Sequence, residues 1–221
     1  MNQFFNSSIG RKYVVGLTGI ALILFLIAHL LGNLQIFAGP KAINDYAAFL
    51  ESVPQLVWPA RIGLLVMFVL HFSFALKLYL ENRAARPKSY ALEDTVQATV
   101  ASRIMALSGT IILMFVIGHL LHFTLGIILP EYAELQDAQG RHDVYSMVIK
   151  GFQVTPIALF YVLALLLLWS HLSHGISSVF QSLGISHSKK GVIGNLGPVL
   201  SSILIIGYVS IPLSVMFGLV K

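Results

Sequence analysis

Four histidines lie inside long apolar segments of this chain and are its main candidates for chemistry: His29, His71, His119 and His171. An imidazole in hydrocarbon must find a hydrogen-bond partner or a metal, because leaving its polar nitrogens unsatisfied there costs free energy. The chain contains no cysteine, so a bound iron would depend on histidine, methionine or tyrosine. Histidine is the best supplied of these, which predicts metal ligation inside apolar segments.

The composition places these histidines in a membrane. Of the 221 residues, 57% are hydrophobic and 10% are charged, and the mean hydropathy is +0.83, values unlike those of soluble domains. Five apolar runs are long enough to cross about 30 Å of hydrocarbon as helices. They are Tyr13 to Phe37, Ala60 to Leu80, Ile104 to Leu129, Val154 to Val179 and Pro198 to Val220. We therefore expect one all-α integral membrane domain over residues 1–221, with the first run retained as an anchor.

The basic residues indicate topology and not nucleic-acid binding. The formal charge is +5, but the Lys and Arg residues flank the apolar runs and form no patch with interleaved aromatics. One side carries Arg11, Lys12, Lys77, Arg83, Arg86, Lys88, Arg103, Lys189 and Lys190, and the other carries Lys41, Arg61, Arg141, Lys150 and Lys221. The positive-inside rule then predicts a multi-pass protein with its N-terminus inside and its C-terminus outside.

Depth along the runs sorts the four histidines into two pairs. His29 and His119 lie about 24 Å and about 22 Å from the inner ends of their runs, so both fall in the outer half. His71 and His171 lie on runs of the opposite direction and fall toward the inner half. Each pair can hold one iron if its two helices are neighbours in a bundle. The pattern predicts two bis-histidine haems in a bundle of the first four spans.

An internal repeat supports the same pairs. Residues 17–31 (LTGIALILFLIAHLL) align with residues 107–121 (LSGTIILMFVIGHLL), and the alignment superposes their histidines. The second and fourth spans match more weakly, as HFSFA against HLSHG, again with the histidines superposed. The second pair of spans therefore resembles a copy of the first in the same orientation, related by an axis along the membrane normal.

Two further histidines, His122 and His174, lie one turn beyond the nearest candidate ligands and compete with them. In the repeat, neither of them aligns with another histidine. They are therefore expected either to form hydrogen bonds around haem propionates or a quinone, or to be merely interfacial residues. Interhelical hydrogen bonding and metal transport are the alternatives to haem ligation for the whole set. For His142 and His187, in expected loops, we predict solvated surface positions.

Charged residues near the ends of the runs are the next candidates. Arg11, Lys77 and Arg103 on the inner side, and Arg61 on the outer side, are candidate partners for haem propionates, although the positive-inside rule alone explains the inner ones. No Asp or Glu lies within the five runs. This argues against a proton-driven transporter, because such proteins commonly use intramembrane carboxylates.

Two outer loops are expected to form short interfacial helices, at Ile43 to Pro54 and at Arg141 to Phe152. These helices could roof a quinone pocket beside the outer haem. Glu51 and Asp143 would there either pass protons between quinone and water or remain solvated loop charges. The fifth run has no histidine or charge, so we expect a structural role for it, with Pro198 near its start.

Several motifs together resemble a known family. The stretch GLTGIALILFLIAHLLGNLQIF, then NDYAAFL, the single-histidine second span, GHLLHF and HLSHGISSVFQSLG are similar to the cytochrome b membrane-anchor subunit of succinate:quinone oxidoreductases. The likeness is to the single-chain, five-helix, two-haem type related to the cytochrome b558 anchors. It covers essentially the whole chain, and HLLGN, HLSHG and FQSLG in combination are its most specific part.

The resemblance implies a place in the respiratory chain and the tricarboxylic acid cycle. The chain would sit in the lipid of the cytoplasmic membrane and hold a flavoprotein and an iron–sulfur subunit at its inner face. Two b haems would carry electrons between the iron–sulfur subunit and a quinone, often menaquinone. By position, the inner haem falls on His71 and His171 and the outer haem on His29 and His119. The dicarboxylate chemistry would lie on another chain, with succinate oxidation and fumarate reduction both open.

Two other classes also remain open from the sequence. A cytochrome b anchor of a formate dehydrogenase or hydrogenase, or a cytochrome b561-like electron carrier, would use the same four histidines. A haem-free channel or scaffold would use them for hydrogen bonding. The identity of co-purifying subunits separates the first class from the family above, and the colour of the pure protein separates the second.

Overall fold

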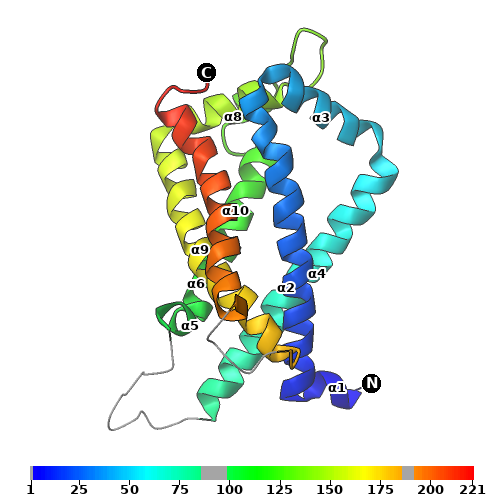
Figure 1. The fold of residues 1–221 in the computed structure, drawn as a ribbon. Coiled ribbons are helices and arrows are strands. Elements are labelled where there is room, and N and C mark those ends of the chain that lie inside the picture. The colour runs from blue at the N-terminus through cyan, green and yellow to red at the C-terminus, as the bar shows by residue number, and fades with distance from the viewer. Residues whose placement is uncertain (1, 86–98, 186–191) are drawn as a thin grey trace.

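The chain forms a bundle of long helices with shorter helices at its ends (Figure 1). The computed structural model describes residues 2–85, 99–185 and 192–221. The elements are α1 (Asn2–Asn6), α2 (Ser8–Asn33), the 3₁₀-helix η1 (Leu34–Ala38), α3 (Pro40–Ser52), α4 (Pro54–Ala84), α5 (Val100–Arg103), α6 (Met105–His119), the π-helix η2 (Leu120–Thr124), α7 (Pro130–Ala133), α8 (Val144–Gln153), α9 (Thr155–Ser182) and α10 (Val192–Met216). Some residues considered above lie outside the described residues: Arg86, Lys88, His187, Lys189 and Lys190.

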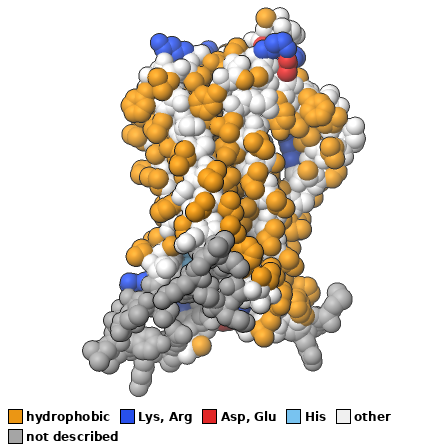
Figure 2. Space-filling model, viewed as in Figure 1, with side chains coloured by type: hydrophobic (Ala, Val, Ile, Leu, Met, Phe, Trp, Pro, Cys, Tyr) orange, Lys and Arg blue, Asp and Glu red, His pale blue; other side chains and the backbone are white. Residues whose placement is uncertain are grey.

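Five segments are long and apolar enough to cross a membrane: Ser8–Ala38, Pro54–Ala84, Met105–Thr124, Thr155–Ser182 and Asn195–Met216. They confirm the predicted all-α, multi-pass membrane protein. Hydrophobic side chains cover most of the flank of the bundle that Figure 2 shows, as a lipid-facing surface requires. The N- and C-termini lie at opposite ends of the bundle (Figure 1), as an odd number of spans demands.

The second span is longer than predicted at both ends. It begins at Pro54 and not at Ala60, because proline is well suited to the first position of a helix. It continues past Leu80 to Ala84, so that Glu81 lies within its last turn. One carboxylate therefore does belong to a membrane-spanning helix, although it lies at the end of that helix.

The third span ends earlier than predicted. The apolar run continues to Leu129, but α6 ends at His119 and gives way to the single-turn π-helix Leu120–Thr124. The chain then leaves the helical conformation, with φ of 60° at Gly126 and 57° at Leu129. Hydropathy could not locate this end, because apolar residues continue into the loop.

The fifth span begins earlier than predicted, since α10 starts at Val192 and contains Pro198. Gly197 does not end the helix but lets α10 approach α9 closely. A Cβ atom at Gly197 would overlap the main-chain carbonyl oxygen of Ser173. Contact with α9 thus keeps this segment helical on both sides of the proline.

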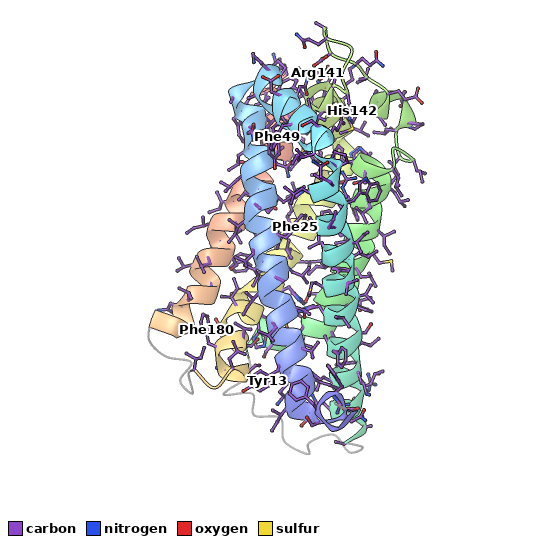
Figure 3. The ribbon with its side chains drawn as sticks, turned by 90° about the vertical axis from the view of Figure 1, so that its right-hand side faces the viewer. Tyr13, Phe25, Phe49, Arg141, His142 and Phe180 are labelled. Atoms are coloured by element: carbon purple, nitrogen blue, oxygen red, sulfur yellow. The ribbon has the colours of Figure 1, made fainter. Side chains whose placement is uncertain are left out.

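Four of the spanning helices form a ring. α2 packs against α4 and α9, and α6 packs against α9 and contacts α4. This order places α2 diagonally opposite α6, and α4 diagonally opposite α9. α10 lies outside the ring, against α9 and α2. The predicted four-helix bundle is therefore present, with the fifth helix added on one side (Figures 1 and 3).

Packing is dense on one side of the ring and open on the other. Buried apolar side chains gather in two clusters, one joining η1, α3, α8, α9 and α10 and the other joining α2, α9 and α10. By contrast, none of the residues of α4 is buried. The interior facing α4 is therefore loosely filled by this chain alone.

Two short helices cover the end of the bundle that carries Arg141 and His142, opposite the end near Tyr13 (Figure 3). They are α3 and α8, and they confirm that the two outer loops contain short helices, at Pro40–Ser52 and Val144–Gln153 and not at the predicted Ile43 to Pro54 and Arg141 to Phe152. Asn44 links them: its amide nitrogen donates to Asp143 Oδ1 at 2.9 Å, and its oxygen accepts from the Tyr145 main-chain N–H at 3.0 Å. We call this end the capped end and the opposite end the N-terminal end.

Candidate haem-ligand site

The four histidines of the apolar segments meet as two pairs inside the ring. The ring centres of His71 and His171 are 6.5 Å apart, with an angle of 65° between the ring planes. Those of His29 and His119 are 5.9 Å apart, with an angle of 89°. These are the pairs that depth and the internal repeat predict.

Each pair joins helices that are diagonal in the ring, and not neighbours as the sequence analysis assumed. His71 on α4 faces His171 on α9, and His29 on α2 faces His119 on α6. The diagonals cross near the axis of the ring, so both pairs lie in its interior.

The two pairs occupy different depths. His71 contacts α2 at Thr18, with 3.2 Å between Nδ1 and Oγ1. His29 lies eleven residues further along α2, which corresponds to about 16 Å. The His71–His171 pair is therefore nearer the N-terminal end, and the His29–His119 pair is nearer the capped end.

The spacing within each pair suits one metal ion between two imidazoles. Two imidazoles bound on opposite sides of a metal, with bonds of about 2.0 Å, have ring centres roughly 6.3 Å apart. The measured 6.5 and 5.9 Å lie on either side of this value. Within the described ranges no group of three or more His, Asp or Glu side chains could hold a metal ion, so each pair offers such an ion two protein ligands.

Hydroxyl groups hold the rings of the His71–His171 pair. His71 Nδ1 lies 3.2 Å from Thr18 Oγ1 and 3.1 Å from the main-chain oxygen of Val15. His171 Nδ1 lies 3.1 Å from Ser108 Oγ. Hydrogen bonds of this kind orient imidazoles that bind metals and fix which nitrogen is free. The sequence analysis named no partner for these nitrogens.

Glycines lie beside both rings of the same pair. A Cβ atom at Gly19 would stand 3.3 Å from His71 Cε1, and one at Gly109 would stand 3.5 Å from His171 Cε1. The first of these distances is tighter than ordinary van der Waals contact. Glycine at these positions gives each imidazole room beside the backbone of the adjacent helix.

Aromatic side chains surround the His29–His119 pair instead. Phe25 stacks on His29, with ring centres 5.2 Å apart and 16° between the planes. Phe115, one turn before His119 on α6, lies 6.0 Å from it between ring centres, with the planes tilted by 38°. Tyr208 of α10 also approaches His29, at 6.2 Å between ring centres. The fifth helix therefore contributes to the surroundings of this pair, which its composition did not predict.

His122 lies on the π-helix η2 and is buried beneath α8. Its Nδ1 lies 3.1 Å from the Tyr161 hydroxyl oxygen, and its ring stacks on Phe123 with 3.9 Å between centres. A Cβ atom at Gly151 of α8 would stand 3.0 Å from His122 Nε2. His122 is thus a hydrogen-bonded residue of the core near the capped end. His174 lies half-buried on α9, one turn from His171.

Arg11 is the one cation of the predicted propionate set that is buried. Its side chain is 7% exposed and forms an ion pair with Glu81 of α4, with 2.7 Å between Nη2 and Oε2. Its Nε is buried and has no hydrogen-bond partner among the described residues. Arg103, Lys77 and Arg61 are exposed, and Arg61 lies over the ring of Trp58 at 5.4 Å.

The acids at the capped end differ from one another. Glu51 is exposed on α3. Asp143 caps α8, and it accepts hydrogen bonds from the main-chain N–H and the hydroxyl of Ser146 as well as from Asn44. Burial acts to raise the pKa of Asp143, but these hydrogen bonds outweigh it and lower the pKa below its ordinary value. Asp143 is thus a structural residue of the cap.

His142 is only in part the solvated loop residue that was predicted. It lies in a loop, but its Nε2 is buried and has no hydrogen-bond partner within the described part of the chain. The side chain lines an open hollow with Ala133, Glu134, Leu135 and Gln136. An isolated antiparallel bridge pairs Gln136 with His142 within this loop.

Comparison with known proteins identifies no relative, since no protein-family model, no curated protein and no solved structure matches this chain. The fold and the site define its class by themselves. The chain is an all-α membrane protein with five candidate spanning helices and two histidine pairs at two depths of a four-helix ring.

Proposed function

We propose that this chain is the dihaem cytochrome b membrane anchor of a succinate dehydrogenase or fumarate reductase. In this role it transfers electrons between an iron–sulfur subunit and a membrane quinone. The family resemblance alone supports menaquinone as this quinone. The observation that carries the proposal is the pair of diagonal histidine contacts, at 6.5 and 5.9 Å between ring centres. Repetition of one arrangement at two depths favours two cofactors of one kind over isolated structural hydrogen bonds.

The haem at each pair would supply one-electron redox chemistry, and the chain would supply its ligands and its surroundings. His71 and His171 ligate the haem near the N-terminal end, and His29 and His119 ligate the haem near the capped end. Since Nδ1 of His71 and of His171 is occupied by a hydrogen bond, Nε2 is the nitrogen left for iron. No residue of α4 is buried, so α4 is the least tightly packed helix of the four that surround the histidine pairs.

Arg11 supports the haem near the N-terminal end. A buried guanidinium with one unpartnered N–H is a donor to a propionate, and charge-assisted hydrogen bonds of this kind are stronger than neutral ones. Arg103 is exposed at the same end and is available to a propionate or to a partner subunit. His174, one turn from His171, is assigned to the same surroundings.

The two ends of the bundle have separate tasks in this proposal. The N-terminal end faces the cytoplasm and carries the flavoprotein and iron–sulfur subunits, because basic residues gather there. The capped end faces outward and takes the quinone, under the roof of α3 and α8. His122, bonded to Tyr161, and the exposed Glu51 are the groups that we assign to proton exchange with this quinone.

The test is a dithionite-reduced minus oxidised absorption spectrum of the detergent-purified complex, with pyridine-haemochrome quantitation. Two b haems per chain, together with a co-purifying flavoprotein and iron–sulfur protein, support the proposal. Two haems with a molybdenum or nickel enzyme would instead identify an anchor of the formate dehydrogenase or hydrogenase type. A colourless, folded protein would overturn the haem assignment and leave the histidines as hydrogen-bonding groups.

A further inference from the structure

The two rings of the His71–His171 pair are held in the same way by two residues at equivalent places. Thr18 is the second residue of the first repeat segment, 17–31, and Ser108 is the second residue of the other, 107–121. Thr18 Oγ1 lies 3.2 Å from Nδ1 of His71, and Ser108 Oγ lies 3.1 Å from Nδ1 of His171. Both hydroxyl side chains belong to buried residues. A chance contact would not recur at matched positions of the repeat.

The direction of these hydrogen bonds follows from the other partners of the hydroxyls. Thr18 Oγ1 donates its proton to the main-chain oxygen of Val14 at 2.6 Å, and Ser108 Oγ donates to that of Met105 at 3.1 Å. Each hydroxyl has one proton, so each oxygen is left to accept from the imidazole N–H. We therefore assign the proton of both rings to Nδ1, and for His71 the main-chain oxygen of Val15 supports this assignment because a carbonyl can only accept.

The His29–His119 pair lacks this arrangement. The part of the chain that the structure describes offers no hydrogen bond to either of its rings, which pack against Phe25, Phe115 and Tyr208. One turn before these histidines the residues are Phe25 and Phe115, and the hydroxyl positions of the repeat lie eleven residues away. Among the described residues, therefore, the His71–His171 pair has hydrogen bonds to the ring nitrogens Nδ1, and the His29–His119 pair has none.

We propose that Thr18 and Ser108 are positioning residues that lower the redox potential of the haem held by His71 and His171, and not that of the other haem. The inference rests on the proposed haem function. A hydrogen bond from the second nitrogen makes an imidazole a more basic ligand, and a more basic ligand stabilises the oxidised iron. The two hydroxyls thus tune one cofactor of the two.

The two hydroxyls contribute unequally. His71 Nδ1 also lies 3.1 Å from the main-chain oxygen of Val15, which remains as an acceptor when the Thr18 hydroxyl is removed. His171 Nδ1 has Ser108 as its hydrogen-bond acceptor, with no second acceptor among the described residues. Removing the hydroxyl of Ser108 should therefore have the larger effect.

The experiment is a redox titration of the purified complex, followed at the haem absorption bands and by electron paramagnetic resonance of the oxidised haems. The variants Ser108→Ala and Thr18→Val remove the hydroxyl. Ser108→Thr and Thr18→Ser change the side chain but keep a hydroxyl at the same place. Thr110→Val is the matched control, because the Thr110 hydroxyl bonds only to its own helix at Ala106 and faces outward. The haem of interest is the one that His171→Ala removes.

For Ser108→Ala we expect the redox potential of the haem at His71 and His171 to rise by about 59 mV. For a one-electron couple this corresponds to a roughly tenfold higher ratio of reduced to oxidised haem at the same solution potential. Thr18→Val should raise this potential less. The two variants that keep the hydroxyl, and Thr110→Val, should have the wild-type potential. The other haem serves as an internal reference and should not move. If Ser108→Ala loses the haem, Ser108→Cys, with its weaker acceptor, should give a smaller shift of the same sign.

The outcomes separate this inference from the proposed function. Two haems in the wild type, with both potentials unchanged in Ser108→Ala and Thr18→Val, would overturn the inference and leave the haem proposal intact. Equal shifts of both haems would also overturn it, because they would indicate a general loosening of the bundle. A wild-type complex without haem would overturn the proposed function and the inference with it.

Discussion

The hydroxyl of Tyr208 on α10 donates a hydrogen bond to the main-chain oxygen of Leu26 on α2, over 2.7 Å. The Tyr208 ring lies 6.2 Å from that of His29, three residues further along α2. This contact ties the fifth helix to the backbone that presents a candidate ligand. α10 therefore does more than fill space beside the ring of helices.

Replacing Tyr208 with phenylalanine should lower the stability of the protein by about 0.5–1.5 kcal/mol, since one hydrogen bond is lost while the ring remains. The loss should appear as a lower Tm in detergent and as altered spectra of the haem at His29 alone. Tyr79→Phe is the control, because Tyr79 lies exposed on α4 and accepts only from Arg83. Equal effects of the two substitutions would contradict a specific role for Tyr208.

Replacement of either histidine of one pair should remove the same haem. We expect His71→Ala and His171→Ala to lose the haem near the N-terminal end, and His29→Ala and His119→Ala to lose the other, because each ring faces its partner across the ring of helices. Pyridine-haemochrome quantitation measures the number of haems, and low-temperature spectra identify which remains. Loss of different haems within one pair would show that the pairs are misassigned.

The same variants should separate the soluble and membrane reactions. Without the haem at His71 and His171, succinate oxidation should no longer reduce quinone, whereas an artificial dye that takes electrons from the soluble subunits should still be reduced. Both rates are measured on the same membranes, so a loss of both would indicate failed assembly. Unchanged quinone reduction in a variant lacking this haem would remove it from the proposed route.

A side chain at Gly19 should displace His71. The position of a Cβ atom there, 3.3 Å from His71 Cε1, leaves no room for the larger valine side chain. Gly19→Val should therefore reduce occupancy of the haem near the N-terminal end while the other haem stays. Gly63→Val is the control, since nothing lies within 4 Å of a Cβ atom at that exposed part of α4. Equal haem contents in the two variants would argue against a cradle at Gly19.

The ion pair between Arg11 and Glu81 predicts that replacing the acid destabilises the protein more than replacing the base. Removing the carboxylate by Glu81→Gln leaves a buried guanidinium without its counter-charge, and should cost about 1–3 kcal/mol of stability. Arg11→Met should cost less, because Glu81 is 44% exposed and can be hydrated once its partner is gone. Thermal unfolding of both variants gives the comparison. The reverse order would mean that Arg11 is stabilised mainly by other groups.

The contacts of Asp143 at the capped end should weaken in acid. Hydrogen bonds from Ser146 and Asn44 outweigh the opposing effect of burial and lower the pKa of Asp143 from its ordinary 3.8. Its contribution to stability is then fully present above pH 3.8 and is lost as the pH falls through the lower folded-state pKa. Limited proteolysis between α7 and α8 should increase in that range. Asp143→Asn should already be more sensitive at neutral pH and show less change with acid.

The sequence by itself determined what depends on distance along a helix. A rise of about 1.5 Å per residue turns positions in an apolar run into depths, so the membrane class, the four histidines and their two levels could all be predicted. The repeat also matches Thr18 with Ser108, beside the aligned glycines Gly19 and Gly109. The hydroxyl partners therefore had a signal in the sequence, which gained its meaning only once both rings were seen beside them.

The tertiary structure decided what depends on contacts between helices. Periodicity does not specify the order of helices around a ring, so only the packing of α2 and α9 with their neighbours shows that each histidine pair crosses a diagonal. The same holds for Tyr208, whose partner is 182 residues away in the chain. The early end of the third span also escaped prediction, because the residues beyond Thr124 are as apolar as the helix before them and only the backbone conformation at Gly126 and Leu129 ends it.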